Sequence, residues 1–349
     1  MSSVELPATM PAAVYRGKGR LEVAEVATPA VGPHDVLLEV SHCGVCGSDI
    51  HFVLEGWGTP DAIEGHEYTG VVAAVGSEVT KWTIGQPVVA GPSRRCGECE
   101  PCRLGRPSLC LHRGDVGTGG YQGAFARYSL THEDEVLALP DGLTLRQAAL
   151  AEPLAVALHG ITQARVEPGH RVIVFGAGPI GALTTAALAA RGVTDLTVVE
   201  PTPSRQALAM AVGATRVVTP DELDEPGWHP GHLIEGPYDR ALECSGNRAA
   251  MEQALGQLGR MGRLVLVGAG INPPRFDANR IMLNELEITG AFVYDVTGFE
   301  DALALLPALP LEHLIEPVDV TLDGLFDALE RLAAGQLAGK VMVNPGGVP

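Results

Sequence analysis

Residues 171–181 read Arg171-Val-Ile-Val-Phe175-Gly176-Ala-Gly178-Pro-Ile-Gly181, a short apolar run followed at once by three spaced glycines. The apolar run predicts a buried strand, and the residues after the last glycine predict a helix over 182–191. Between a strand and a helix, the first glycine permits a tight turn. The second lets the backbone approach a pyrophosphate, and the third allows close helix–strand packing. This stretch therefore predicts a dinucleotide-binding unit, with the phosphates at the helix N-terminus.

An acidic residue supports this prediction and indicates which dinucleotide binds. A second predicted strand, 196–200, ends on Glu200, which lies 19 residues beyond Gly181. A carboxylate there accepts hydrogen bonds from the ribose hydroxyls and repels a 2′-phosphate, so NAD is favoured over NADP. Arg205 either stacks on adenine or softens this repulsion, or it is an ordinary surface arginine. The predicted cofactor contacts are Gly176, Gly178, Pro179, Ile180, Gly181, Glu200 and Arg205.

Residues 170–293 alternate predicted strands and helices, which is the pattern of a doubly wound parallel sheet. Further strands are expected at 240–244, 263–267 and 287–293. Cys244 falls on one of these strands and is interpreted as a core residue. The segment 220–239 is rich in proline and acidic residues, and we assign its His229 and His232 to a loop rather than to a metal site.

The chain before this region has a different pattern. Residues 11–140 contain short predicted strands, for example 36–40, 68–75 and 87–90, with glycine, proline and aspartate between them. Many short strands at this spacing indicate an all-β, barrel-like unit. The pattern turns helical at Thr144, which forms a predicted capping box with Gln147. Helices near 299–306 and 325–334 and a strand at 340–343 are expected after the parallel sheet.

Two motifs in the β unit carry metal-binding side chains. They read Cys43-Gly-Val-Cys46-Gly-Ser48-Asp49-Ile-His51 and, further along, Gly65-His66-Glu67. Zinc takes cysteine sulfur, histidine nitrogen and carboxylate oxygen, and a catalytic zinc keeps one position free. We expect Cys46 and His66 to hold such a zinc, and Ser48 and His51 to move a proton away from it.

A third protein ligand has to come from elsewhere in the chain, and Glu152 is the candidate. This carboxylate stands in an apolar stretch beside Pro153, which would interrupt a helix. A buried glutamate needs a partner, and a metal ion is one. An exposed glutamate at a helix end is the alternative, and the local sequence leaves both open.

The spacing Cys96-x-x-Cys99-x-x-Cys102-x₇-Cys110 predicts a second metal site. Four cysteines this close together can complete a tetrahedral zinc site with no free position, which is a structural arrangement. Such a site would stabilise a polar lobe at about 94–112. An iron–sulfur cluster and redox-active thiols are the alternatives.

Composition limits the class of protein. A length of 349 residues favours two domains, and a hydrophobic content of 46% with 43 glycines suits a soluble α/β protein. Its formal charge of −18, with only three lysines, disfavours nucleic acid and membrane partners. Residues 1–13 lack the pattern of a signal peptide, and the uncharged run 172–190 reads as strand, turn and helix rather than a membrane span. We therefore expect a cytoplasmic protein with reduced thiols.

Together these motifs resemble the zinc-containing medium-chain dehydrogenase/reductase family, from about Pro11 to Val343. The resemblance implies an α/β protein with a GroES-like β-barrel catalytic domain at 1–156 and 295–349. A Rossmann domain at 157–294 would be inserted between its two parts, and the active site would lie in the cleft. The resemblance also implies two zinc ions per chain, a small alcohol or ketone substrate, and a homo-oligomer, with a tetramer favoured over a dimer.

The resemblance assigns roles residue by residue. Glu67 matches a carboxylate that ligates zinc in some members and stays nearby in others, and Asp49 would orient His66. Cys43 matches no ligand and is interpreted as a bystander. The remaining matches are Cys46, His66 and Glu152 as catalytic zinc ligands, Ser48 and His51 as the proton relay, and Cys96, Cys99, Cys102 and Cys110 as the structural site.

With a glutamate at position 152 as third ligand, the chain resembles the polyol, butanediol, glucose and threonine dehydrogenase branches of the family. This resemblance implies reversible, NAD(P)-linked oxidation of a secondary alcohol, diol or polyol to the ketone. Sorbitol-type members carry an Arg-Tyr pair whose arginine binds substrate hydroxyls, where this chain has Val293-Tyr294. A polyhydroxylated substrate is therefore less favoured. Phe52 and Trp57 would form an apolar pocket wall or ordinary core.

Other functions are weighed against this one. A threonine- or glucose-dehydrogenase-like member of the same family is the nearest alternative. A zinc-free quinone or enoyl reductase is disfavoured because all the metal ligands are retained. A non-enzymatic zinc- and nucleotide-binding subunit is disfavoured because Ser48 and His51 are both present.

Overall fold

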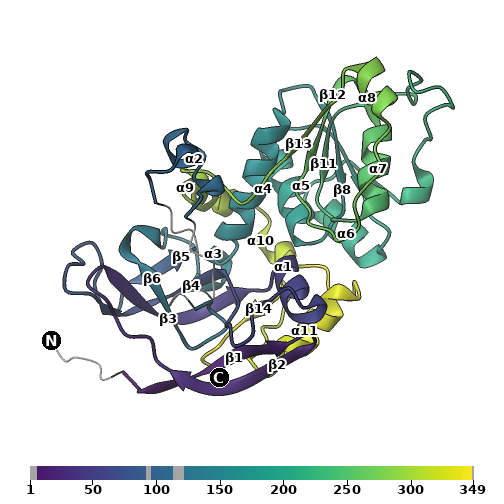
Figure 1. The fold of residues 1–349 in the computed structure, drawn as a ribbon. Coiled ribbons are helices and arrows are strands. Elements are labelled where there is room, and N and C mark those ends of the chain that lie inside the picture. The colour runs from purple at the N-terminus through teal and green to yellow at the C-terminus, as the bar shows by residue number, and fades with distance from the viewer. Residues whose placement is uncertain (1–5, 92–95, 113–121, 348–349) are drawn as a thin grey trace. The chain divides into compact units, whose positions relative to one another are not determined.

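The computed structural model describes residues 6–91, 96–112 and 122–347 (Figure 1). Residues 94 and 95 of the predicted metal-binding lobe lie outside these ranges. The chain divides into two compact units. The first is Met1–Glu152 with Ile315–Pro349, and the second is Pro153–Leu314. Each unit has its own six-stranded sheet.

The sheet of the second unit is parallel throughout, in the order β10-β9-β8-β11-β12-β13. The chain winds outward from β8 to β10 and then returns to the other side of β8, so the order reverses between β8 and β11. This confirms the predicted doubly wound sheet, in which ligands bind outside the carboxyl ends of the strands at the point of reversal. The strands are β8 (Arg171–Phe175), β9 (Asp195–Val199), β10 (Arg216–Val218), β11 (Tyr238–Glu243), β12 (Leu258–Leu266) and β13 (Glu287–Gly290).

Helices cover both faces of this sheet, with α5 on one side and α7 and α8 on the other (Figure 1). Residues 172–175 of β8 are buried, which explains why this strand is an unbroken apolar run. The helical elements are α4 (Ala151–Ala164), α5 (Pro179–Ala190), α6 (Pro203–Ala211), η4 (Pro220–Glu222), α7 (Arg248–Gly256), α8 (Ala278–Asn284), α9 (Gly298–Leu305), η5 (Leu306–Ala308) and α10 (Leu311–Leu314).

The sheet of the first unit is antiparallel, and its short strands agree with the all-β unit predicted for this region. This sheet has the order β14-β3-β4-β5-β7, with β6 also paired to β3, and a separate hairpin joins β1 to β2. Because β14 pairs with β3, the two ends of the chain share one sheet. The strands are β1 (Thr9–Gly17), β2 (Arg20–Ala27), β3 (Asp35–Gly44), β4 (Glu67–Val75), β5 (Pro87–Ala90), β6 (Tyr128–His132), β7 (Val136–Ala138) and β14 (Met342–Val343).

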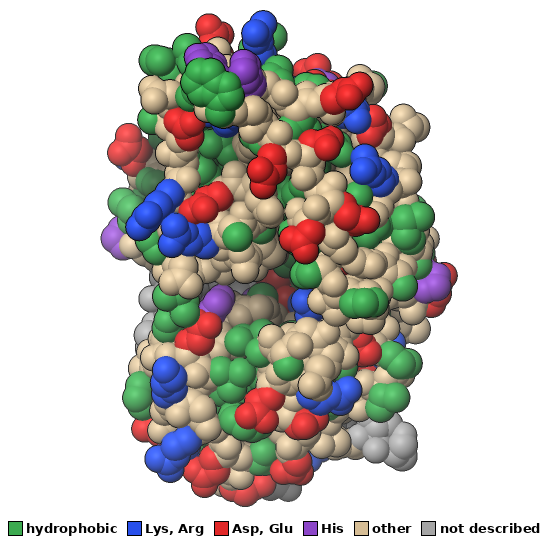
Figure 2. All heavy atoms as spheres, turned by 90° about the vertical axis from the view of Figure 1, so that its right-hand side faces the viewer, with side chains coloured by type: hydrophobic (Ala, Val, Ile, Leu, Met, Phe, Trp, Pro, Cys, Tyr) green, Lys and Arg blue, Asp and Glu red, His purple; other side chains and the backbone are tan. Residues whose placement is uncertain are grey.

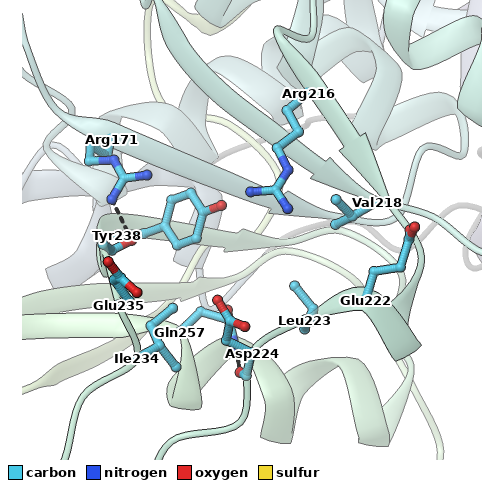
Figure 3. A pocket seen from close by; sticks show the side chains of 11 residues that line it. Arg171, Arg216, Val218, Glu222, Leu223, Asp224, Ile234, Glu235, Tyr238 and Gln257 are labelled. Atoms are coloured by element: carbon cyan, nitrogen blue, oxygen red, sulfur yellow. Dashed lines mark hydrogen bonds between the residues drawn. The ribbon is translucent and has the colours of Figure 1, made fainter.

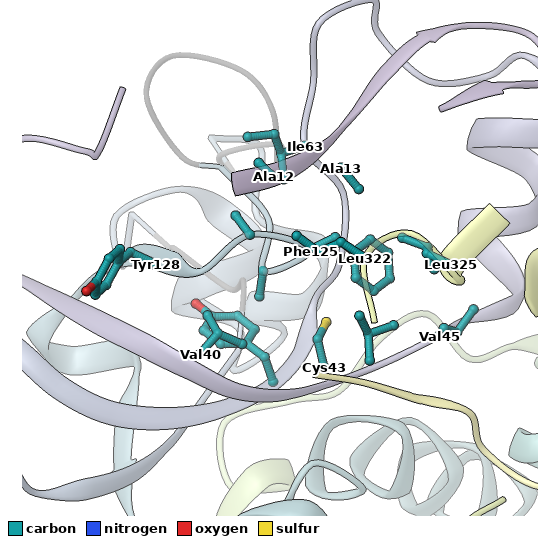
Figure 4. Packing of buried hydrophobic residues seen from close by; sticks show 14 of the residues in the cluster. Ala12, Ala13, Val40, Cys43, Val45, Ile63, Phe125, Tyr128, Leu322 and Leu325 are labelled. Atoms are coloured by element: carbon teal, nitrogen blue, oxygen red, sulfur yellow. The ribbon is translucent and has the colours of Figure 1, made fainter. Parts of the chain in front are cut away.

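The core of this unit lies around Phe125, which is 1% exposed (Figure 4). Cys43 in β3 and Val45, just after its end, pack in the same cluster as Leu325. Leu325 belongs to helix α11, whose apolar face is buried in this core. Cys43 is thus a core residue. The short helices of the unit are α1 (Gly47–Ile50), η1 (His51–Glu55), α2 (Glu100–Arg103), η2 (Pro107–Leu109), η3 (Glu133–Glu135), α3 (Leu145–Ala148) and α11 (Leu325–Ala333).

Three predicted boundaries differ from those observed. Helix α5 begins at Pro179, because a proline at the first helical position lacks only an N–H that would have no partner. The last predicted strand ends at Gly290, and Val293 has a φ of 56°, which an extended strand does not allow. Pro153 lies in the first turn of α4 and does not interrupt it, for the same reason as Pro179.

One face of the molecule is mixed in charge. On the face drawn in Figure 2, acidic side chains are scattered among basic and hydrophobic ones rather than gathered in one patch. None of the helices in the described parts of the chain combines the length and the apolar character that crossing a membrane requires.

The packing of the glycine loop generates a matched pair of variants. A Cβ at Gly181 would lie 1.9 Å from the Gly176 carbonyl oxygen, whereas a Cβ at Gly178 would meet no atom within 4 Å. We expect Gly181→Ala to lower the free energy of unfolding by about 1–3 kcal/mol through overpacking. Gly178→Ala should melt like the parent but bind dinucleotide more weakly, because the new methyl enters the space of the pyrophosphate. Equal thermal melting of the two variants would contradict this reading.

Candidate active site and metal centres

The register of two strands brings the metal-binding motifs together. β3 pairs with β4 so that Gly44 lies opposite Glu67. Cys46 follows the end of β3, and His66 precedes the start of β4, so both stand at the same end of the strand pair. The hydrogen-bond ladder thus makes neighbours of two motifs that are separate in the sequence.

A short helix and a glycine orient these side chains. Cys46 is the N-cap of α1, and its N–H donates to Asp49 Oδ2 at 2.8 Å. The other oxygen of Asp49, Oδ1, lies 3.9 Å from His66 Nδ1. Gly65 has a φ of 99°, and a Cβ there would lie 2.8 Å from the backbone nitrogen of Phe125. Asp49 therefore lies close to both Cys46 and His66, but its distance from His66 is longer than a hydrogen bond.

Three side chains offer ligand atoms to one ion. Cys46, His66 and Glu67 each present one such atom, and these atoms lie within 4.8 Å of one another. Sulfur, nitrogen and carboxylate oxygen are the donors that zinc takes. Glu152 is outside this group, although it is buried at the start of α4 with 6% of its surface exposed. The residues present fit a catalytic zinc, with two glutamates near it.

Buried negative charge favours a cation in this site. Burial lowers the pKa of His66, but the charge of Cys46, with those of Asp49 and Glu152, outweighs burial and raises the pKa well above its ordinary value. Burial raises the pKa of Asp49 to about 6. Asp49 Oδ1 is buried and accepts no hydrogen bond in the described structure. The negative charge around His66 is what a bound metal ion would compensate.

Glu67 has a cationic neighbour that the sequence analysis missed. Lys340 Nζ donates to Glu67 Oε1 at 2.7 Å and lies 2.7 Å from Oε2. Burial lowers the pKa of Lys340, but the charges of Glu67 and Cys46 outweigh it and raise the pKa above its ordinary value. The sequence did contain a signal for this pair, since Lys340 starts the apolar strand predicted at 340–343. A lysine on a buried strand indicates a buried acidic partner, because lysine is almost never fully buried unless paired.

The predicted proton relay lies on one helical segment. Ser48 in α1 and His51 at the start of the π-helical turn η1 are three residues apart, a spacing that shares a helix face. His51 Nδ1 lies 2.5 Å from Glu55 Oε2, and its ring stacks on Trp57 with centroids 4.9 Å apart. Trp57 is 52% exposed and so is not a core residue. Glu55 was missed, although its i+4 spacing from His51 was visible in the sequence.

The four cysteines of the lobe form a second group of ligand atoms within 4.8 Å. The Sγ atoms of Cys110 and Cys96 are 3.6 Å apart, and those of Cys99 and Cys110 are 3.9 Å apart. Zinc–sulfur bonds of about 2.3 Å in a tetrahedron place sulfur atoms about 3.8 Å apart. Backbone N–H groups of Leu111 and Cys102 lower the pKa of Cys99 to about 6, which favours the thiolate that binds metal. The site fits a structural zinc.

The dinucleotide loop is built as its glycines predict. Gly176 has a φ of 89° in the tight turn after β8, and Gly178 is the N-cap of α5. Glu200 follows β9 and is buried, and its carboxylate accepts from Ala177 N at 2.8 Å and from Thr202 N at 2.9 Å. Each oxygen keeps a lone pair for a ribose hydroxyl. Pro179, Ile180 and Gly181 form the first turn of α5, and Arg205 lies in α6.

Two other features of the second unit lie apart from this chemistry. A pocket is lined by Arg171, Arg216 and Tyr238, which stand at the amino ends of their parallel strands (Figure 3). The glycine loop follows the carboxyl end of β8, at the opposite edge of the sheet. His229 and His232 have ring centroids 5.3 Å apart but form no group with a third ligand among the described residues. We assign neither feature a part in the reaction.

Comparisons with known proteins agree with this geometry. Residues 32–141 match the alcohol dehydrogenase GroES-like domain, and residues 179–308 match the zinc-binding dehydrogenase family. Sorbitol dehydrogenase of Bacillus subtilis (strain 168) is 32% identical, over 97% of this chain and 98% of its own length. Among solved structures, 2R,3R-butanediol dehydrogenase from Bacillus subtilis is 29% identical with a TM-score of 0.85, over 96% of this chain and 99% of that one. A Sinorhizobium meliloti 1021 protein bound to NADP is 30% identical with a TM-score of 0.87, over 97% and 100%.

The fold and the two metal-binding groups define a zinc-containing oxidoreductase with a dinucleotide cofactor. The chain belongs to the zinc-containing medium-chain dehydrogenase/reductase family. It is an enzyme of the zinc-dependent alcohol and polyol dehydrogenase class, which confirms the class predicted from the sequence.

The cysteine lobe has little apolar core, so its metal should stabilise it. We expect Cys99→Ser to lose one zinc per chain and to melt several degrees lower, because binding energy at a structural zinc site is folding energy. Elemental analysis and thermal melting measure the two effects. Cys46→Ser is the control, since it should lose the other zinc with a smaller change in melting. Unchanged melting of Cys99→Ser with one zinc fewer would count against a structural role.

Proposed function

We propose that this chain oxidises a secondary alcohol, diol or polyol to the ketone with NAD, and reduces the ketone in the reverse direction. The observation that carries the proposal is the group of Cys46, His66 and Glu67, whose ligand atoms lie within 4.8 Å of one another. The segment α1–η1, which carries Ser48 and His51, starts at this group. The names of two relatives, a sorbitol and a butanediol dehydrogenase, support the substrate class.

In this proposal Cys46 and His66 hold the catalytic zinc, with a carboxylate from Glu152 or Glu67. When bound, zinc supplies a Lewis acid that lowers the pKa of the substrate hydroxyl. Asp49 would help to orient His66, because Asp49 Oδ1 lies 3.9 Å from His66 Nδ1. The proton leaves through Ser48 to His51. Because the side chain of His51 is 18% exposed, it can release the proton to solvent.

The second unit binds the dinucleotide through the glycine loop and Glu200. The carboxylate of Glu200 is fixed by two backbone N–H groups, so its charge stays where a 2′-phosphate would enter. This supports NAD as the preferred cofactor, although one relative structure holds NADP. Burial of the reacting carbons away from water would favour direct hydride transfer.

Other parts of the proposal extend it to substrate size and assembly. Val293 offers no charged donor for substrate hydroxyls, so we expect secondary alcohols and short diols to be better substrates than sugar alcohols. We further propose two zinc ions per chain and a cytoplasmic homotetramer. Seven cysteines without a disulfide in the structure support a reducing compartment.

A substrate panel with a metal-site variant tests the proposal. Secondary alcohols, vicinal diols, polyols, sugars and hydroxy amino acids are offered with NAD and NADP, and reduced cofactor is followed at its absorbance. We expect the alcohols and short diols to react fastest with NAD. Cys46→Ser should lose turnover but still bind NAD, because the glycine loop belongs to the other compact unit. Turnover that persists in Cys46→Ser freed of metal would refute the assignment.

The role of Glu200 is tested by the ratio of the two cofactors. Glu200→Ala removes the charge and leaves the N–H groups of Ala177 and Thr202 without their acceptor, so the Kd for NAD should rise. The Kd for NADP should rise less or fall, because the repulsion is gone. Glu200→Gln is the control that keeps one acceptor oxygen. An unchanged ratio of the two Kd values in both variants would remove Glu200 from this role.

A further inference from the structure

Lys340 is one of only three lysines in the chain, and it is buried in the first unit. It precedes β14, the strand that joins the C-terminal segment to β3. Its Nζ donates to the carbonyl oxygen of Val45 at 3.0 Å and to Glu67 Oε1 at 2.7 Å. The side chains of Lys340 and Glu67 are 1% and 0% exposed. This is a dry ion pair inside the metal-binding end of the sheet.

The absence of a side chain at Gly44 leaves space for this ion pair. A Cβ at Gly44 would lie 2.2 Å from Glu67 Oε2 and 3.2 Å from Lys340 Cδ. Only a bare backbone leaves room for both side chains beside β3. The pair is therefore part of the architecture of this site, and a buried lysine without its carboxylate would be strongly destabilising.

Glu67 stands between two positions for positive charge. Lys340 Nζ donates to Oε1 of this carboxylate at 2.7 Å and also lies 2.7 Å from Oε2. A carboxylate oxygen of Glu67 also lies within 4.8 Å of the ligand atoms of Cys46 and His66. The carboxylate of Glu67 can therefore either pair with the Lys340 ammonium or coordinate a metal ion.

Both cations are needed to offset the buried negative charge. Cys46, Asp49, Glu67 and Glu152 carry four negative charges when ionised, and a zinc ion with Lys340 carries three positive ones. Without the ammonium, zinc would have to compensate Glu67 in a site where an unpaired buried charge is costly. Glu67 would then move onto the metal and fill a position that substrate needs.

We propose that Lys340 is a positioning residue that holds Glu67 away from the zinc and so keeps a coordination position open. The inference rests on the proposed function, since it needs a zinc bound by Cys46 and His66. It adds a residue from the far end of the chain to the determinants of metal coordination.

Lys340→Met tests this, because methionine has a similar volume and no charge. We expect zinc to bind about 10- to 100-fold more tightly in a chelator competition, the scale of effect that neighbours of metal ligands have. With Co²⁺ in place of zinc, the visible absorption should weaken as the metal goes from four to five ligands. Turnover should fall while NAD binding is unchanged.

Two further variants keep the test sharp. Lys340→Arg keeps the charge and should keep the parent cobalt spectrum. Adding Glu67→Gln to Lys340→Met should restore the parent spectrum and lower the zinc affinity again, and this double variant also removes the unpaired buried charge that would threaten folding. An unchanged cobalt spectrum and zinc affinity in folded Lys340→Met would overturn the proposal, leaving a purely structural ion pair. If the parent enzyme itself binds no zinc at Cys46, the proposed function fails first, and the two failures are thereby distinguished.

Discussion

The antiparallel pairing of β3 with β4 is the constraint on which the metal site depends. It sets Gly44 opposite Glu67, and so it places Cys46 and His66 at one end of the ladder. A shift of one residue in this register would turn every side chain of one strand to the other face. The register is held by the core beneath it, where Cys43 and Phe125 pack with less than 2% exposure.

The same end of the sheet collects negative charge that only a cation can compensate. Cys46, Asp49, Glu67 and Glu152 all lie in the first unit, and their charges act on His66 or Lys340. Burial of Asp49, Glu67 and Lys340 makes these interactions stronger than they would be in water. The proposed zinc would compensate part of this charge, which is an argument independent of any likeness to relatives. The structure also explains why the C-terminal segment carries a lysine at this position.

The sequence predicted the main elements of the fold, but not all of the contacts between side chains. The alternation of strands and helices over 170–293 predicted the parallel sheet. The glycines at 176–181 predicted the dinucleotide-binding loop, because each has a separate steric role. The strands near 36–40, 68–75 and 87–90 were found because their apolar residues are local signals. Pro153 was misread as a helix break, since a proline in a first turn and a proline inside a helix look alike without the hydrogen bonds around them. Glu55 and Lys340 were missed because their partners are decided by a helical turn and by a strand from the other end of the chain.

By itself, the sequence determined the doubly wound unit, the family of the chain and the donor types at both metal-binding groups. These follow from residue type and local spacing, which any fold must respect. Only the tertiary structure decided that Glu67 stands with Cys46 and His66 while Glu152 lies outside that group, and that Lys340 is bound to Glu67. These contacts depend on the register of β3 with β4 and on the pairing of β14 with β3. Both bring together residues that are far apart along the chain, and no local pattern in the sequence indicates that they are in contact.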